Sequence, residues 1–247
     1  DFAAYATSAM REARNSRDVV ARVRKASGIT IEVIEGSREA EVVYANHIEH
    51  RLDPKKNYLY VDVGGGSTEV SLIARGKRAG DGSFSVGTVR MLRGRPVKRA
   101  MDGLKKWVKQ HREEYGPMTA IGSGGNINTI FKLARAKQGR PLTFETVRDI
   151  YRLVNSHSLE ERVVTLGLRP DRADVIVYAA GVYLSVMKWG RIDSIFVPQV
   201  GLSDGIVHLL YERHRRGRVR AWSFSLARSL RSLGAVPSPD TRGAMEK

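Results

Sequence analysis

Residues 57–75 constrain the fold of this 247-residue chain more than any other stretch. Positions 58–63 are rich in β-branched and aromatic side chains, which is typical of a buried strand, and positions 70–74 have the alternation of a second strand. Three consecutive glycines, at positions 64–66, lie between the two runs. The sequence therefore predicts a β-hairpin with a glycine-rich turn.

This turn carries the residue types of an anion site. Gly64, Gly65 and Gly66 lack a Cβ, so the backbone can take positive φ and a ligand can approach it closely. The N–H groups of Ser67 and Thr68 are then free to face an anion. The pattern favours a turn that binds phosphate through its main chain.

Two carboxylates flank the turn, Asp62 at the end of one strand and Glu69 at the start of the next. Carboxylates beside a phosphate imply either a divalent metal held between them or a base that activates water. Both readings concern phosphate chemistry.

A second glycine-rich turn follows an apolar run and leads into a segment with helical spacing of apolar residues at 127–134. A strand, a glycine turn and a helix in this order present unpaired N–H groups and the positive end of a helix dipole. One such turn is weak support, but two at strand ends strengthen the phosphate interpretation. The second turn's candidate phosphate-binding residues are Gly122, Ser123, Gly124 and Gly125.

The composition narrows the class of protein. A hydrophobic content of 42% is enough to build cores, and the absence of cysteine excludes disulfides, thiolate zinc sites and a cysteine nucleophile. No apolar run has the length of a membrane span and no leader-like segment is present, so we expect a cytoplasmic protein without membrane contact.

The formal net charge of +16 favours polyanionic partners: nucleic acid, acidic lipid, polyphosphate or phosphorylated nucleotides. The chain has neither zinc-finger spacing nor the aromatic and basic interleaving of RNA-binding modules, which leaves nucleic acid the minor hypothesis. We keep a homodimer as a candidate assembly.

Periodicity along the chain gives a coarse order of elements. A strand, a helix over 9–25, a strand over 29–34 and a helix over 37–50 precede the hairpin, with a boundary near 53–56. A third strand pair is expected within 83–92. Further helices are expected over 100–115, 143–155, 158–165, 173–189 and 203–213, and a strand over 192–197.

The segment 62–69, Asp-Val-Gly-Gly-Gly-Ser-Thr-Glu, resembles the second phosphate motif of the exopolyphosphatase and guanosine pentaphosphate phosphohydrolase (Ppx/GppA) family. Residues 6–15 are similar to that family's Ala-Thr-Ser-Ala-Leu-Arg-x-Ala-x-Asn segment, and residues 34–40 to its Ile-x-Gly-x-x-Glu-Ala segment. The resemblance runs in order through roughly residues 2–213. Shorter matching pieces lie at 87–90, 172–176 and 201–205.

This resemblance implies an α/β, actin/Hsp70/sugar-kinase-like (ribonuclease H-like) two-domain fold. The implied reaction is hydrolysis of the terminal phosphoanhydride of polyphosphate or pppGpp, assisted by Mg²⁺ or another divalent cation, in the cleft between the domains. We expect 1–56 to be the C-terminal part of a first domain, 57–202 a second domain, 203–216 a closing helix and 217–247 a poorly ordered tail.

The resemblance also implies residue roles. Glu39 matches the proposed general base, Asp62 and Glu69 match acidic residues that hold the metal or its waters, and Arg11 matches a basic contact to substrate phosphates. The phosphate-binding turn corresponds to Gly64, Gly65, Gly66, Ser67 and Thr68.

One departure is that the family's first phosphate motif, of the type Asp-x-Gly-Ser-Asn-Ser, has no match here. We therefore expect the first domain to be incomplete and this chain alone to be a weak catalyst, with activity restored by an upstream segment. Two alternatives remain: a truncated homologue that binds polyanions without turnover, and a nucleotide-binding kinase-like member of the superfamily.

Overall fold

The computed structural model describes residues 3–35, 53–198, 205–207 and 209–215. It is an α/β fold, as predicted. Residues 205–207 and 209–215 are helical. The other elements in chain order are β1 (Ala4–Ala6), α1 (Ser8–Arg11), α2 (Ser16–Ser27), β2 (Ile31–Val33), β3 (Asn57–Val63), β4 (Thr68–Ala74), β5 (Lys77–Phe84), α4 (Thr88–Leu92), α5 (Lys98–Tyr115), β6 (Met118–Ser123), α6 (Gly124–Leu133), β7 (Leu142–Thr143), α7 (Phe144–Ser156), α8 (Leu159–Val164), α9 (Pro170–Ala173), α10 (Ile176–Gly190) and β8 (Ser194–Phe196).

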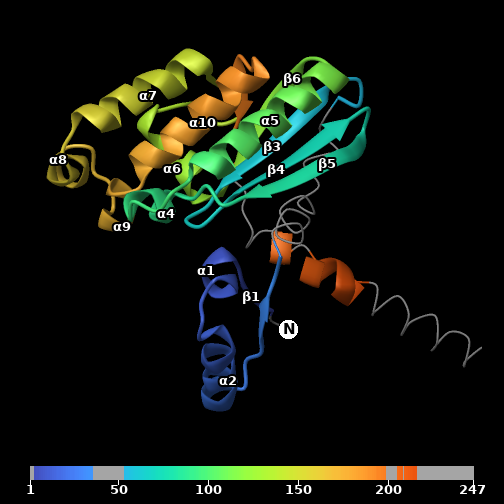
Figure 1. Cartoon of the computed structure of the whole chain (residues 1–247), viewed down its shortest axis with the longest axis vertical. Helices are drawn as coiled ribbons and strands as arrows, with labels where there is room; N and C mark the ends of the chain where they lie inside the picture. The colour runs from blue at the N-terminus through green and yellow to red at the C-terminus, as the bar shows by residue number, and fades with distance from the viewer. Residues whose placement is uncertain (1–2, 36–52, 199–204, 208, 216–247) are drawn as a thin grey trace, which may run out of the picture.

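A six-stranded mixed sheet organises the larger part of the molecule (Figure 1). Its strand order is β5-β4-β3-β6-β8-β7, in which β3, β6 and β8 run parallel and the other pairings are antiparallel. The predicted hairpin is confirmed as β3 and β4. Its register sets Asp62 opposite Glu69 and Val63 opposite Thr68, so the two carboxylates lie on one face of the sheet.

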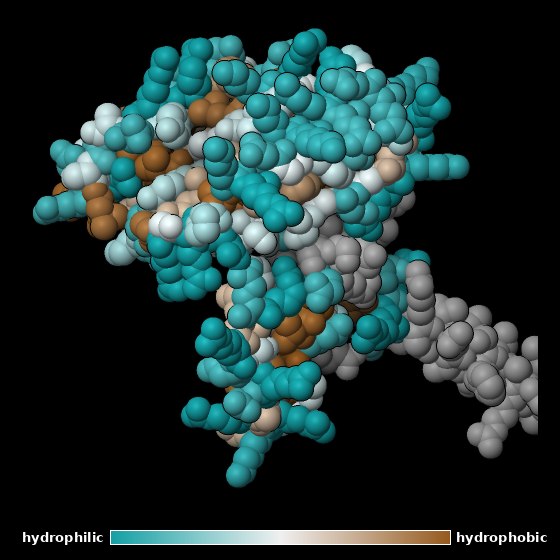
Figure 2. Space-filling model, in the orientation of Figure 1, coloured by the Kyte–Doolittle hydropathy of each residue, from teal (hydrophilic) through white to brown (hydrophobic). Residues whose placement is uncertain are grey.

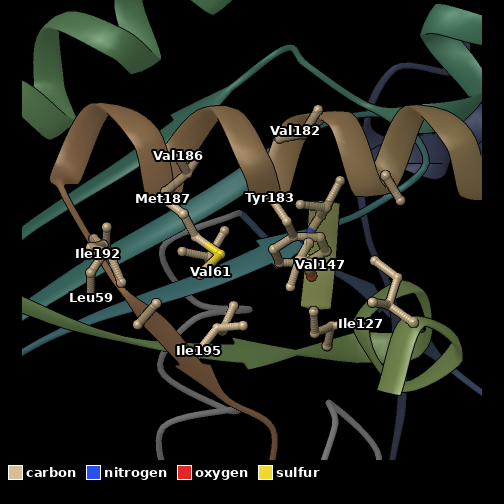
Figure 3. Close-up of a cluster of buried hydrophobic side chains, with 14 of the residues drawn as sticks. Leu59, Val61, Ile127, Val147, Val182, Tyr183, Val186, Met187, Ile192 and Ile195 are labelled. Atoms are coloured by element: carbon tan, nitrogen blue, oxygen red, sulfur yellow. The ribbon is translucent and has the colours of Figure 1, made fainter. Parts of the chain in front are cut away.

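Helices cover the opposite face of this sheet and form the core with it. The helix α10 packs against α5, α6, α7 and β3, which explains why its sequence is apolar nearly all round. Figure 3 shows Tyr183, Val186 and Met187 of α10 directed toward the strands that carry Val61 and Ile195. This packing fixes the carboxyl ends of β3 and β6, where both glycine-rich turns begin.

A smaller α/β unit precedes the large sheet in the chain. Its strands β1 and β2 pair in parallel, with α1 and α2 between them in sequence (Figure 1). The single helix expected over 9–25 is wrong: α1 ends at Arg11 and α2 begins at Ser16, with Gly28 at φ 73° as its C-cap. The break leaves α1 as a short separate helix at the glycine turn of the large sheet.

Two other expectations need correction. Residues 83–92 form the end of β5 and then the helix α4 rather than a strand pair, and 173–189 is divided between α9 and α10. The expected capping box at Ser158 and Glu161 is confirmed in α8. The helix expected over 37–50 and the tail 217–247 lie outside the described residues, and the domain boundaries stay a prediction.

Candidate active site

Glycine is needed in the first turn for close packing. Gly64 donates its N–H to the carbonyl of Ser67 at 2.9 Å, and none of the three glycines has φ in the left-handed region. A Cβ on Gly66 would instead lie 1.9 Å from Oγ of Ser8, which belongs to α1. The expectation of positive φ is therefore wrong, and the close approach of α1 accounts for the glycine at position 66.

The helix α4 holds the turn from its other side through the carbonyl oxygens. The N–H groups of Thr88 and Val89 donate to the carbonyls of Gly64 and Gly65 at 3.0 and 2.9 Å, and Arg90 Nε donates to the carbonyl of Gly66 at 3.1 Å. Within residues 53–198, no hydrogen bond uses the N–H groups of Gly65, Gly66 or Ser67. The carbonyl oxygens of the turn are therefore bonded to α4, while three of its N–H groups have no partner among residues 53–198, an arrangement typical of turns that bind anions.

The second glycine-rich turn lies directly beside the first. The parallel pairing of β3 with β6 sets Asp62 next to Ser123, whose Oγ donates to Asp62 Oδ2 at 3.1 Å. The helix α6 begins at Gly124, immediately after this strand. The sheet thus brings both predicted turns together at the carboxyl ends of neighbouring parallel strands.

Two side chains from the helical layer fix the end of β3. Asn126 Nδ2 donates to the carbonyl of Val63 at 2.6 Å, and the N–H of Val63 donates to the hydroxyl of Tyr183 at 3.3 Å. The same hydroxyl donates to the carbonyl of Ser123 at 3.2 Å. Burial, and then the charge of Asp62, raises the pKa of Tyr183 well above its ordinary value, so this hydroxyl remains a donor that ties the two turns together.

Glu69 is a buried carboxylate with a perturbed pKa. Its side chain is 6% exposed, and burial raises its pKa above the ordinary value, while hydrogen bonds and the charge of Arg11 act in the opposite direction. Ser67 Oγ donates to Glu69 Oε1 at 2.5 Å and Ser83 Oγ donates to it at 3.2 Å. A desolvated carboxylate in a pocket is typical of sites that bind a cation or move a proton.

A pocket of about 420 Å³ lies between α1 and the first turn. Arg90 of α4 forms an ion pair with Glu12, which also accepts a hydrogen bond from Ser8 at 3.3 Å, so the pocket joins the small unit to the large sheet. It is lined by Thr7, Ser8, Ala9, Glu12, Ala13, Gly64, Gly65, Gly66, Ser67, Glu69, Val89, Arg90, Arg93 and Arg95.

Five of the candidate residues line this pocket: Gly64, Gly65, Gly66, Ser67 and Glu69. Asp62, at the end of β3, and the second turn, at the end of the neighbouring strand β6, do not line the pocket.

Two other candidates are engaged elsewhere. Thr68 is fully buried and donates to the carbonyl of Val86 at 2.6 Å. Arg11 donates to the carbonyl of Ile34 at 2.5 Å and pairs with Glu35 at 3.8 Å. Glu39 lies outside the described residues. The roles of all these residues stay predictions.

The structure adds residues that the sequence reasoning missed. Ser8, Glu12 and Arg90 fall within segments that carry the family resemblance, but the resemblance gave no role to any of the three. Tyr183 gave no signal, because a tyrosine on an apolar helix is ordinarily a core residue. The guanidinium of Arg172 lies over the start of α6, where Nη2 would be 3.0 Å from a Cβ built on Gly125.

Fold and site together define an α/β protein in which two glycine-rich turns and a buried carboxylate meet beside a cleft. The chain belongs to the Ppx/GppA phosphatase family, whose family model matches residues 2–214. This confirms the resemblance and the prediction of an enzyme. Within the part of the chain that the structure describes, no helix is long and apolar enough to cross a membrane.

Named relatives agree with this assignment. The chain is 25% identical to Exopolyphosphatase 1 of Mycobacterium bovis over 258 residues, which cover 96% of this chain and 75% of the relative. It is 25% identical to the guanosine-5'-triphosphate,3'-diphosphate pyrophosphatase of Photobacterium profundum, covering 87% of this chain and 46% of the relative. The crystal structure of the Aquifex aeolicus Ppx/GppA phosphatase, type II variant, has a TM-score of 0.63 at 26% identity, covering 83% of this chain and 74% of that one.

Proposed function

We propose that this chain hydrolyses the terminal phosphoanhydride bond of inorganic polyphosphate, of pppGpp, or of both. The observation that carries the proposal is the pocket in which the donor groups of the turn at Gly65, Gly66 and Ser67 adjoin the buried carboxylate of Glu69. Relatives are named for polyphosphate and for guanosine pentaphosphate chemistry, which supports both substrates.

Phosphoryl transfer to water needs positioning and charge neutralisation more than a covalent nucleophile. The N–H groups of the first turn would bind non-bridging oxygens of the terminal phosphate, and the start of α6 with Arg172 would add positive potential nearby. Glu39 remains our candidate for the base that takes the proton of the attacking water. Because Tyr183 and α4 fix the turn, its donors keep their positions when substrate binds.

The residues present fit a magnesium ion. Asp62 and Glu69 lie opposite each other on one face of the hairpin, and Mg²⁺ in phosphate-transfer sites is usually held by one or two carboxylates together with substrate oxygens and water. Such an ion would offset the free-energy cost of burying the ionised carboxylate of Glu69, and it would neutralise charge on the transferred phosphate. We extend the proposal to a cytoplasmic enzyme that uses Mg²⁺ and forms a homodimer.

The test is phosphate release from long-chain polyphosphate and from pppGpp by the wild type, Glu39→Gln and Glu69→Gln. Each substitution should lower kcat by about 100-fold or more, as for the loss of a positioned acid–base or electrostatic group. The matched control is Glu113→Gln, an exposed glutamate on α5 that should retain activity. Undiminished hydrolysis by Glu39→Gln would show that Glu39 is not the general base. Binding of polyphosphate by the wild type without phosphate release would favour the alternative of a homologue that binds polyanions without turnover.

A further inference from the structure

Three arginines line the outer wall of the pocket. Arg90 lies on α4, Arg93 follows that helix directly and Arg95 comes two residues later; all three line the cavity that contains the glycine turn. Because α4 begins on the carbonyls of Gly64 and Gly65, its length leads away from the turn (Figure 1). The arginines therefore form a sequence of positive charges that starts at the turn and continues outward.

The three arginines differ in what they contact. The side chain of Arg90 is 16% exposed, pairs with Glu12 and donates to the carbonyl of Gly66, so its guanidinium serves the structure of the turn. Arg93 and Arg95 are exposed, and no ion pair or side-chain hydrogen bond within the described residues engages either one. Their charges are thus available to a ligand in the pocket.

The backbone that carries these two arginines is fixed. The N–H of Gly94 donates to the carbonyl of Met91 at 2.9 Å and the N–H of Arg95 donates to that of Arg90 at 3.0 Å, which together form a Schellman motif. Gly94 has φ 64°, the left-handed conformation that this motif requires. Arg93 and Arg95 are therefore held at defined positions after the helix.

The outer part of the pocket is strongly positive. The sequence contains no acidic residue between Asp81 and Asp102, and five basic ones, of which Lys98 and Arg99 continue the exposed run onto α5. Figure 2 shows hydrophilic side chains over much of the visible face of the large sheet and its helices, with smaller apolar patches between them. Of the two acidic residues that line the pocket, Glu12 is neutralised by Arg90 and Glu69 is buried beside the turn.

We propose that Arg93 and Arg95 form a distal phosphate subsite that binds the internal phosphates of a linear polyphosphate whose terminal phosphate occupies the glycine turn. Guanidinium groups match phosphate oxygens with paired donors, and a polyphosphate presents a charge at each successive phosphate. A substrate with only three linked phosphates would engage the turn without a long run of charge beyond it. This subsite rests on the proposed function and makes extended polyphosphate the preferred substrate.

The experiment compares the wild type with the double variant Arg93→Gln/Arg95→Gln and with Lys105→Gln/Lys106→Gln. The control pair loses the same two charges from exposed positions of α5 that do not line the pocket. For each protein, KM and the Kd of binding in the presence of Mg²⁺ are measured for long-chain polyphosphate, tripolyphosphate and pppGpp, with thermal unfolding as the check of folding.

We expect Arg93→Gln/Arg95→Gln to raise the Kd and KM for long-chain polyphosphate roughly tenfold, and those for the two short substrates by less than about twofold. The control pair should change all three by less than about twofold. Equal weakening for long and short substrates, or no weakening for the long one, would overturn the subsite. The Kd can be measured without turnover. If the protein releases no phosphate but its Kd shows this dependence on chain length, the proposed hydrolysis is contradicted and the subsite is supported.

Discussion

Glu69 carries a carboxylate whose burial opposes folding when it is ionised. Burial raises its pKa from the ordinary value of 4.5, so the folded state holds this proton more tightly than the unfolded chain does. The ionised carboxylate therefore costs folding free energy, and this cost is absent below the unfolded pKa and grows as the pH rises through the folded pKa.

We predict that Glu69→Gln is more stable than the wild type at neutral pH and that this advantage shrinks as the pH falls toward 4.5. Thermal unfolding in the absence of Mg²⁺, followed over the range from about pH 5 to pH 8, measures the difference. The exposed Glu113→Gln serves as the control. A difference in Tm that does not vary with pH would show that burial of the charge is not the cause.

Tyr183→Phe tests the hydroxyl that joins the two turns. Its loss leaves the N–H of Val63 and the carbonyl of Ser123 without this partner in the core, and we expect a loss of about 1–3 kcal/mol in the free energy of unfolding. If the hydroxyl positions the turns, KM for polyphosphate rises as well, whereas a purely structural role leaves KM unchanged. Urea unfolding and steady-state kinetics measure both, with the exposed Tyr211→Phe as the control.

At the scale of elements, the packing of α1 on the glycine turn gives a steric prediction. Gly66→Ala forces α1 away, because the new Cβ would lie 1.9 Å from Oγ and 3.1 Å from Cβ of Ser8. We expect phosphate release to fall about tenfold or more, since small displacements of positioning groups are costly in catalysis.

Restoring space tests the cause of that loss. The double variant Ser8→Gly/Gly66→Ala removes both clashing atoms and should regain part of the activity in the same phosphate-release assay. Gly103→Ala on α5 is the control, because its Cβ would come no closer than 3.5 Å to another side chain. An inactive double variant with a normal Tm would mean that contact with Ser8 is not the reason for glycine at position 66.

The elements that could be predicted from the sequence are those that neighbouring residues determine. The hairpin and the strand–turn–helix at 118–133 can be predicted from the sequence, because strand alternation, glycine and helical spacing follow one another along the chain. The helix α4 cannot be predicted in this way, because its first N–H groups donate to carbonyls in a turn more than twenty residues earlier. The contact of Tyr183 with Val63 likewise spans 120 residues and has no local signature.

At the scale of the whole molecule, the ion pair between Glu12 and Arg90 links the small unit to the large sheet across the pocket. Glu12→Gln should change global stability by less than about 1 kcal/mol, because its side chain is 43% exposed. Amide exchange in α1 and in the turn at 64–67 should nevertheless become faster, while exchange in α7 stays the same. Hydrogen-exchange mass spectrometry of the variant and of Glu113→Gln measures this, and unchanged exchange in α1 would contradict the link.

In the proposed reaction, water attacks the terminal phosphate of a polyphosphate chain held in this pocket. The most direct test of this attack is hydrolysis of long-chain polyphosphate in water enriched in heavy oxygen, with Mg²⁺ and without a phosphate acceptor, by the wild type and Glu69→Gln. We predict that each released phosphate carries one heavy oxygen, that the shortened chain carries none and that release is largely lost in the variant. Heavy oxygen in the shortened chain, or no release without an acceptor, would contradict the claim.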